Sequence, residues 1–194
     1  TLGQLADNKQ RQVSEFVARH KAAIAQLAQL PDFAAALGDC PQGQCRLDGQ
    51  PLTDHAAWQA RWQHYLDTAG AHDLLLVSPA GQVVYSVRRE TDLYASLYQP
   101  PLKTSILTQG VRLAIISRKA QFTGFQPHAP SGDLPSAFAI APVMHQGVLR
   151  GVLVLQLDTR LLQAILNDRT ALGQTGETIL AQLARDGRMA LYTS

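Results

Sequence analysis

The sequence predicts an α+β fold: a long N-terminal helix packed on a five-strand antiparallel sheet, with the helices on one side of the sheet. Three observations support this prediction. Residues 2–29 repeat apolar side chains with a helical period, strand-like segments recur between residues 73 and 157, and tight turns join neighbouring strands. Apolar residues make up 46% of the 194 residues, enough for a packed core, which excludes a wholly disordered chain.

The N-terminal part of the chain predicts three helices. The first covers residues 2–29, because no Gly or Pro interrupts residues 4–30 and Pro31 ends it. A short second helix is expected from Pro31 to Leu37. A third is expected from Asp54 to about residue 69, where Gly70 supplies the stop.

The loop Cys40-Pro-Gln-Gly-Gln-Cys45 holds the two cysteines of the chain. Four intervening residues with Pro and Gly allow the two sulfurs to meet, so a disulfide is the preferred interpretation. Reduced bystander thiols are the main alternative. A metal site is disfavoured, because structural zinc needs four ligands and no other Cys or nearby His supplies them. A disulfide would imply an oxidising compartment such as a periplasm.

The middle of the chain predicts the sheet. A hairpin joins strands 73–77 and 82–87 through Ser78-Pro-Ala-Gly81, and an irregular stretch, 88–101, follows it. A helix is expected over residues 103–118 despite Gly110. Three further strands are predicted, over residues 121–126, 136–144 and 148–157, the last two joined by a turn at His145-Gln-Gly147.

The last 36 positions resemble the start of a second copy of this module: a connecting helix, then two strands around Arg185-Asp-Gly-Arg188. We therefore divide the chain into a spine helix (1–30), a sheet-bearing module (31–158) and an incomplete second module (159–194). Because the chain begins with Thr1, we expect it to be a fragment of a longer protein.

Composition and motifs exclude several function classes. Seventeen Lys and Arg against 15 Asp and Glu give a net charge of +2 without a block of like charges, so the footprint of a nucleic-acid-binding protein is missing. Ser131 lies in Pro-Ser-Gly rather than a hydrolase Gly-x-Ser-x-Gly, and Gly173-Gln-Thr-Gly176 lacks the Lys of a phosphate loop. We expect no enzymatic activity, no cofactor and no metal in this segment.

Several strings, in order, resemble one receptor family. They are Leu76-Val-Ser-Pro-Ala-Gly-Gln-Val-Val-Tyr85, Phe125-Gln-Pro-His-Ala-Pro-Ser-Gly132, Gly151-Val-Leu-Val-Leu-Gln156 and Leu172-Gly-Gln-Thr-Gly-Glu-Thr-Ile-Leu180. Together with the long first helix, they resemble the extracytoplasmic double Cache sensor domains of bacterial receptors, in which a helix precedes two PAS-like modules.

That resemblance implies a location, a role and partners. The chain would lie in the periplasm, with membrane spans outside this fragment, and bind a small molecule in its membrane-distal module. It would signal to a chemotaxis, histidine kinase or cyclic-nucleotide output domain. The alternative is a ligand-free dimerisation or spacer module, since the Ala-rich second half of the first helix suits close pairing in a homodimer.

The sequence departs from the amino-acid-binding members of that family. In those members a Tyr is followed by an Arg and then by Trp-Tyr. This sequence has no Arg-x-Trp-Tyr near Tyr94 or Tyr98. Gln156 stands where they place an Asp, and an amide offers an α-ammonium no charge-assisted bond. An ordinary amino-acid ligand is therefore disfavoured.

Strand alternation selects the pocket face. Leu153, Leu155 and Leu157 would pack on the long helix, which leaves Val152, Val154 and Gln156 toward the pocket. A buried amide needs a partner, and a neighbouring backbone group is the alternative to a ligand. The predicted ligand contacts are Tyr85, Tyr98, Phe125, His128, Phe138 and Gln156.

Each of the other contacts has a structural alternative. The tyrosines would otherwise pack under the covering segment 88–101, the phenylalanines would belong to the core, and His128 would be a solvated loop residue. The turn Ser131-Gly-Asp133 offers backbone N–H groups to an anion. Ligand binding is expected to close residues 88–101 and, through Asp158, to move the helix predicted at 159–167.

Overall fold

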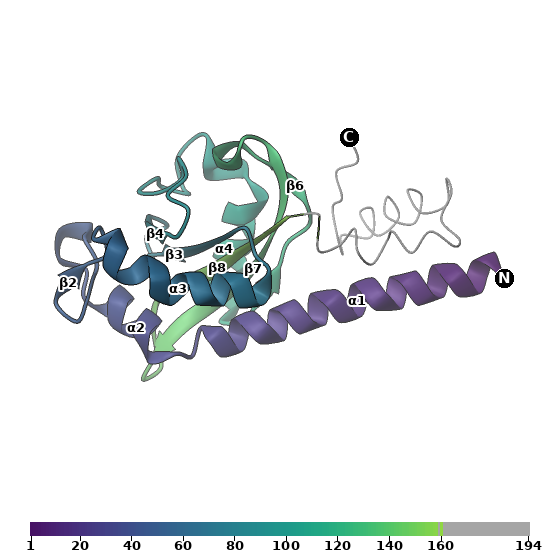
Figure 1. Cartoon of the computed structure of the whole chain (residues 1–194), viewed down its shortest axis with the longest axis horizontal. Helices are drawn as coiled ribbons and strands as arrows, with labels where there is room; N and C mark the ends of the chain where they lie inside the picture. Colours follow the sequence, from purple (N-terminus) through teal and green to yellow (C-terminus); the bar gives the residue numbers. More distant parts are fainter. Residues whose placement is uncertain (159, 161–194) are drawn as a thin grey trace.

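The computed structural model describes residues 1–158 and 160, so the predictions for the connecting helix and the second module lie outside the described residues. Helix α1 (Leu2–Leu27) runs as a long rod, with the N-terminus at the end remote from the sheet (Figure 1). Thr1 and Gln4 form a capping box at its start. The buried Val13, Phe16 and Ile24 lie on its sheet-facing stripe, as the helical period predicts.

Two further helices follow α1 and complete one layer. Helix α2 (Pro31–Gly38) starts on Pro31, and the Sγ atoms of Cys40 and Cys45 are joined by a disulfide around the short helix η1 (Pro41–Gly43). A small hairpin of β1 (Arg46–Leu47) and β2 (Gln50–Pro51), absent from the sequence prediction, leads to α3 (His55–Ala69). Gly70 ends α3 in the left-handed conformation, with φ 61°.

The central sheet is antiparallel throughout, in the order β4-β3-β8-β7-β5, with β6 also paired to β7. Its long strands are β7 (Leu134–His145) and β8 (Val148–Asp158). The shorter strands are β3 (Asp73–Val77), β4 (Val83–Ser86), β5 (Gln121–Phe122) and β6 (Gln126–His128). The sheet that the sequence predicts is therefore confirmed, with six strands instead of five.

The extra strand arises because the predicted strand 121–126 is interrupted. Thr123 accepts the Phe138 backbone N–H on its side-chain Oγ1 at 2.9 Å, while its own N–H donates to the Phe138 carbonyl. A side chain thus replaces a backbone acceptor in the ladder, and pairing resumes at Gln126 with the register moved by one residue.

Helices cover both faces of the sheet, which corrects the expectation of helices on one side. Helices α1, α2 and α3 pack on the face that carries Leu153 and Leu155, which we call the helix face. Helix α4 (Ile106–Ser117), preceded by η2 (Leu102–Thr104), packs on the face that carries Val152 and Val154, which we call the α4 face. Figure 1 shows α3 in front of the sheet and α4 behind it.

The irregular segment 88–101 lies along the edge of β4 on the α4 face. Tyr94 donates its backbone N–H to Val83, Val83 donates to Ala95, and the Leu97 N–H reaches the Gly81 carbonyl, all within 3.0 Å. Leu97 is fully buried. The segment therefore covers the α4 face, as predicted, and backbone hydrogen bonds hold it there.

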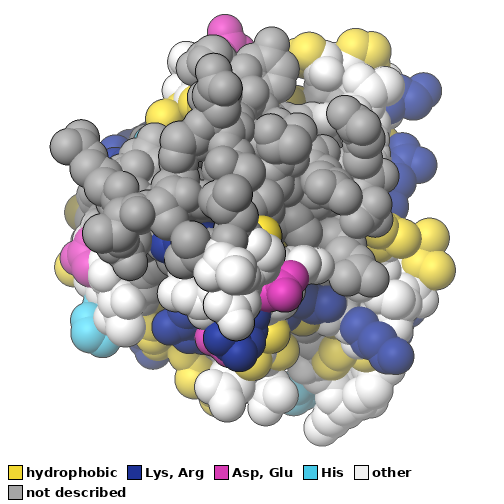
Figure 2. Space-filling model, turned by 90° about the vertical axis from the view of Figure 1, so that its right-hand side faces the viewer, with side chains coloured by type: hydrophobic (Ala, Val, Ile, Leu, Met, Phe, Trp, Pro, Cys, Tyr) yellow, Lys and Arg dark blue, Asp and Glu magenta, His cyan; other side chains and the backbone are white. Residues whose placement is uncertain are grey.

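Figure 2 shows how basic side chains are distributed on one face of the described residues. On the face shown in Figure 2, Lys and Arg side chains occupy several separate places among polar and apolar ones. Within the part of the chain that the structure describes, no helix combines the length and the apolar character that a bilayer crossing requires.

Candidate functional site

The α4 face changes character along its length. At the end near the β3–β4 turn it is apolar, with Val77, Val83 and Val152 in one buried cluster. At the other end, Asp73 pairs in register with Gln156, and Gln156 pairs with Phe138 on the next strand. Gln156 is fully buried and shares its face with Val152 and Val154, as alternation predicts.

Buried and partly buried polar side chains gather around Gln156 at this end. We call them the polar cluster and define it as His72, Asp73, Ser86, Glu90, Asp92, His128, Ser131, Ser136 and Gln156. Its members come from the sheet, from segment 88–101 and from the turn η3 (Ala129–Ser131). Hydrogen bonds connect most of them, and the ring of His128 lies 5.1 Å from that of Phe138.

Asp73 anchors the sheet side of the polar cluster. One carboxylate oxygen accepts from Ser86 Oγ at 2.6 Å, and the other accepts from the backbone N–H groups of Leu74 and Arg88. Burial raises the pKa of Asp73 to about 6; the three hydrogen bonds oppose that rise, and the nearby Asp92 adds to it.

Segment 88–101 supplies two more carboxylates, each paired with a histidine. Glu90 lies 2.8 Å from His72 Nε2 and also accepts from the Ser131 hydroxyl. Asp92 lies 3.0 Å from His128 Nε2, and both side chains of this pair are buried. These pairs hold the start of segment 88–101 against His72 and His128.

Two acceptor atoms in the polar cluster have no hydrogen-bond partner among the residues that the structure describes. They are Asp92 Oδ1 and Gln156 Oε1. The amide nitrogen of Gln156 donates to Ser131 and Ser136, both at 2.9 Å, so the orientation of the amide is set. An unpartnered buried polar atom costs about 1–3 kcal/mol, so a hydrogen-bond donor from outside the protein would stabilise the fold here.

Three of the six predicted ligand contacts meet at this site. Gln156 and Phe138 are cross-strand neighbours, and His128 stacks edge-on against Phe138 while it bonds Asp92. His128 is 4% exposed, so the alternative of a solvated loop residue is wrong. The alternative of a backbone partner for Gln156 is also not what the structure shows, since its amide bonds two serine hydroxyls.

The other three predicted contacts lie elsewhere. Tyr85 points to the helix face, 4.5 Å from the ring of Trp62, because a bulge in β4 reverses the alternation between Val83 and Tyr85. Burial raises the pKa of Tyr85 to about 12. Phe125 also belongs to the core of the helix face.

Tyr98 lies at the apolar end of the α4 face. Its ring covers Gly81, where an added Cβ would come within 2.7 Å of the ring, and Arg112 stacks over it at 4.5 Å. Gly81 lies in the turn that comes after Val77. Val77 and Asp73 are four residues apart along β3, so about 13 Å separates them at ~3.3 Å per residue. Tyr98 therefore helps to pack segment 88–101 against the apolar end of the α4 face and is not part of the polar cluster.

Sequence reasoning missed most of the polar cluster. Asp73 was available as the one charged residue of an otherwise apolar strand, and its burial follows from that position. Asp92 and Glu90 carried no such signal, because they lie in an irregular segment where charged residues are usually solvated. The Ser131 turn was noticed for its backbone, but the structure uses its side chain.

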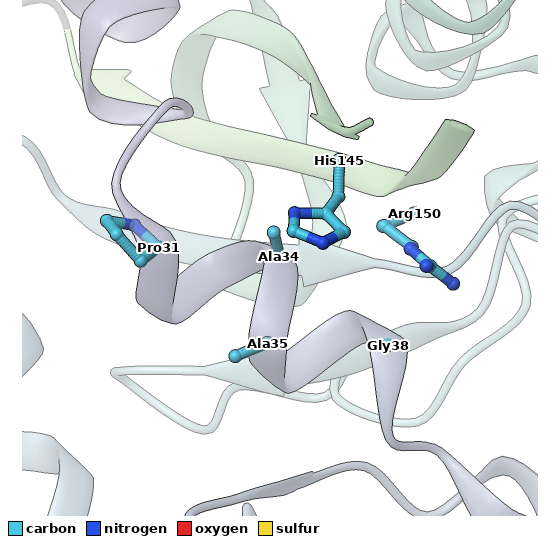
Figure 3. Close-up of a pocket in the computed structure, with 6 residues that line it drawn as sticks. All are labelled: Pro31, Ala34, Ala35, Gly38, His145 and Arg150. Atoms are coloured by element: carbon cyan, nitrogen blue, oxygen red, sulfur yellow. The ribbon is translucent and has the colours of Figure 1, made fainter. Parts of the chain in front are cut away.

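A second concave site lies at the far end of β8. A cavity of about 360 Å³ opens between α2 and the β7–β8 turn (Figure 3). It is lined by Pro31, Ala34, Ala35, Gly38, His145 and Arg150. None of the predicted contacts lines it, and its wall is largely apolar, with only His145 and Arg150 as charged or titratable groups.

The described residues do not assemble a metal site, since no group of three or more His, Cys, Asp or Glu among them has suitable geometry. The histidines of the polar cluster are instead committed to carboxylates. The polar cluster is thus suited to bind a ligand through hydrogen bonds and electrostatic attraction.

No family model matches the sequence, and no curated protein matches it either. Solved structures do. The sensor domain of the V. cholerae histidine kinase DctB is similar with a TM-score of 0.55 and 16% identity, over 87% of this chain and 61% of that chain. The sensory domain of the Campylobacter jejuni chemoreceptor Tlp3 gives a TM-score of 0.56 and 14% identity, over 85% and 62%.

The ligand-binding domain of the Pseudomonas fluorescens chemoreceptor CtaA, in complex with L-serine, gives a TM-score of 0.51 and 16% identity, over 87% of this chain and 60% of that chain. This chain thus spans about three fifths of the length of these structures. At such identities the likeness concerns the fold. The chain therefore has the fold of receptor sensor domains, as its resemblance to the double Cache domains predicts.

Proposed function

We propose that this chain is the extracytoplasmic small-molecule sensor domain of a bacterial transmembrane receptor and that its ligand binds at the polar cluster. The observation that carries the proposal is the pair of buried acceptors, Asp92 Oδ1 and Gln156 Oε1, within a polar cluster on the α4 face. Buried ionisable groups and unpartnered polar atoms are costly, so a cluster of them on one sheet face is more than the stability of the fold requires.

Two further observations support this proposal. The fold is that of sensor and ligand-binding domains of a histidine kinase and of chemoreceptors. The disulfide between Cys40 and Cys45 fits a domain exposed to an oxidising compartment, where such bonds persist. A signalling or membrane-spanning part would then lie in the remainder of the receptor.

Strand β8 offers a route from the ligand to the rest of the receptor. Gln156 lies two residues before Asp158, whose carboxylate accepts from the backbone and the side chain of Arg160 at 2.9 and 2.8 Å. Burial acts to raise the pKa of Asp158, but Arg160 outweighs it and lowers that pKa below its usual value. A ligand that prefers one position of β8 by ~1.4 kcal/mol would change the ratio of two states tenfold.

Thermal denaturation of the 194-residue chain against a library of amines, organic acids and purines tests this function. We expect one class to raise the melting temperature and Gln156→Ala to abolish the shift. Gln109→Ala, the same change on the exposed side of α4, is the control and should keep it.

The spacer alternative makes a different prediction for the same samples. It predicts that no compound shifts the melting temperature and that sedimentation shows dimers forming as the protein concentration rises. That pair of results would replace the sensor proposal. Conversion of a library compound would contradict a purely binding role.

A further inference from the structure

The two unpartnered acceptors define what the ligand must supply. A carboxylate oxygen and an amide oxygen accept hydrogen bonds and cannot donate them. Gln156 cannot turn its amide to offer a donor instead, because Nε2 already bonds Ser131 and Ser136. A group that meets both atoms must therefore bring N–H or O–H donors.

The charge around these acceptors is negative. The cluster holds three carboxylates, Asp73, Glu90 and Asp92, and two imidazoles, of which His72 pairs with Glu90 and His128 with Asp92. With all three carboxylates ionised, the sum stays negative even when both imidazoles are protonated. The pKa of Asp73, about 6, leaves most of this carboxyl ionised at neutral pH.

Other charged groups near the polar cluster do not reverse its sign. Arg88 and Arg89 have exposed side chains. Their backbone N–H groups donate to Asp73 and Ser86, and Arg88 also donates its Nε to the backbone carbonyl of His72 at the edge of the cluster. Asp158 is paired with Arg160. The field at the acceptors thus favours a positively charged donor over a neutral one, and charge-assisted hydrogen bonds are about twice as strong as neutral ones.

No buried Lys or Arg among the described residues faces the polar cluster. Among the buried residues that the structure describes, the only Lys or Arg is Lys9, which lies on α1 and so on the helix side of the sheet. An amino acid or a dicarboxylate would place its own negative charge beside Asp73, Glu90 and Asp92 without a buried Lys or Arg to bind it.

We propose that the polar cluster selects a compact organic cation with N–H donors and no carboxylate, such as a primary ammonium or a guanidinium. This inference rests on the proposed sensor function and names its ligand class. The cation would donate to Asp92 Oδ1 and Gln156 Oε1, and its apolar part would lie toward Phe138 and the apolar stretch of the α4 face. Water is the competing hydrogen-bond donor at these two acceptors, but it carries no positive charge.

The test is calorimetric and thermal titration of the whole chain with four matched probe sets. These are primary alkyl- and arylalkylammonium ions with methylguanidinium, the alcohols of the same carbon skeletons, L-valine with L-serine, and succinate. We expect binding by members of the first set and none by their alcohol counterparts. Asp92→Asn should weaken that binding about tenfold or more, the loss of one charge-assisted bond.

Two further variants serve as a matched control and as an independent test of the charge. Asp133→Asn makes the same change on an exposed aspartate of the neighbouring turn and should leave affinity unchanged. Gln156→Glu adds a further negative charge to the site and should strengthen binding of the ammonium probes, which decides the matter if Asp92→Asn does not fold.

The possible failures are distinguishable. Binding of L-valine, L-serine or succinate, without binding of the cations, overturns this inference and leaves the sensor function standing. Equal binding of ammonium ions and alcohols, or cation affinity unchanged in both Asp92→Asn and Gln156→Glu, also overturns it. Absence of binding by every probe overturns the inference, and failure of the wider library as well removes the sensor proposal.

Discussion

The two faces of the central sheet bury different chemistry. The helix face is mainly apolar and holds the largest side chains, with Trp62 4.5 Å from Tyr85 and 5.4 Å from Phe33, although Trp62 Nε1 has no hydrogen-bond partner among the described residues. The α4 face is apolar near Val77 and Val152 but ends in carboxylates, imidazoles, hydroxyls and an amide. One sheet thus combines a face that stabilises the fold with a face that keeps unpartnered acceptors.

This difference separates stability from binding within a small domain. A change on the helix face should lower stability without regard to pH or ligand. A change in the polar cluster should alter how stability depends on pH and ligand. Three substitutions test that separation, in order of decreasing expected effect.

Trp62→Ala should produce the largest loss of stability. The ring is fully buried between Phe33 and Tyr85, and removal of such a side chain leaves a cavity that costs about 3–5 kcal/mol. Urea denaturation measures the loss. Gln59→Ala, on the exposed side of the same helix, should change stability by no more than about 0.5 kcal/mol. A small effect of Trp62→Ala would mean that the helix face is not the stabilising one.

Asp73→Asn should change the pH dependence of stability. Burial raises the pKa of Asp73 from 3.8 to about 6, so the folded state binds a proton more tightly than the unfolded state. Stability should therefore fall as pH rises between about 4 and 6, by an amount on the order of 3 kcal/mol for this shift. The Asn side chain does not titrate in this interval, so the substitution should remove this pH dependence.

Denaturation curves across this pH interval check the prediction. The wild-type chain should lose stability with rising pH, and Asp73→Asn should lose much less. Asp48→Asn, at an exposed position, should retain the wild-type slope. If the slope persisted in Asp73→Asn, the carboxyl would not be the buried titrating group of the α4 face.

Gly110→Val should have the smallest of the three effects, and it tests the apolar part of the α4 face. A Cβ at Gly110 would come within 2.5 Å of Ile140 Cδ1 and 2.8 Å of Thr123 Cγ2. Overpacking of this kind costs about 1–3 kcal/mol, and the hydrogen bonds of Thr123 to Phe138 restrict its retreat. Thermal denaturation of Gly110→Val should be compared with that of Gln109→Val, at an exposed position of α4. This comparison separates the effect of packing from the effect of helix propensity. Equal effects would contradict a close α4 contact.

The sequence supported the element order because each element carries a local signal. Pro31, Gly70 and the Ser78-Pro-Ala-Gly81 turn mark boundaries by their backbone preferences, and the structure places ends or turns there. Gln156 was identified because an amide in an apolar strand must face a polar partner. That partner could not be named from the sequence, since Ser131 and Ser136 come from other elements.

The errors have equally specific causes. Tyr85 was expected among the ligand contacts, but the bulge in β4 turns its side chain to the helix face, and a bulge cannot be located from strand pattern alone. The helix at Gly110 was expected, but not its side of the sheet, because an amphipathic helix fits either face of a sheet that is buried on both. Glu90 and Asp92 joined the site only through the path of an irregular segment.

By itself the sequence determined the helices, the antiparallel strands, the close cysteine pair and the face of Gln156, because helical period, turn residues and alternation act over a few neighbouring positions. The tertiary structure alone decided which carboxylates lie beside that amide. Asp73, Asp92 and His128 meet through a sheet register and a covering segment, and such long-range pairing depends on the packing of the whole domain.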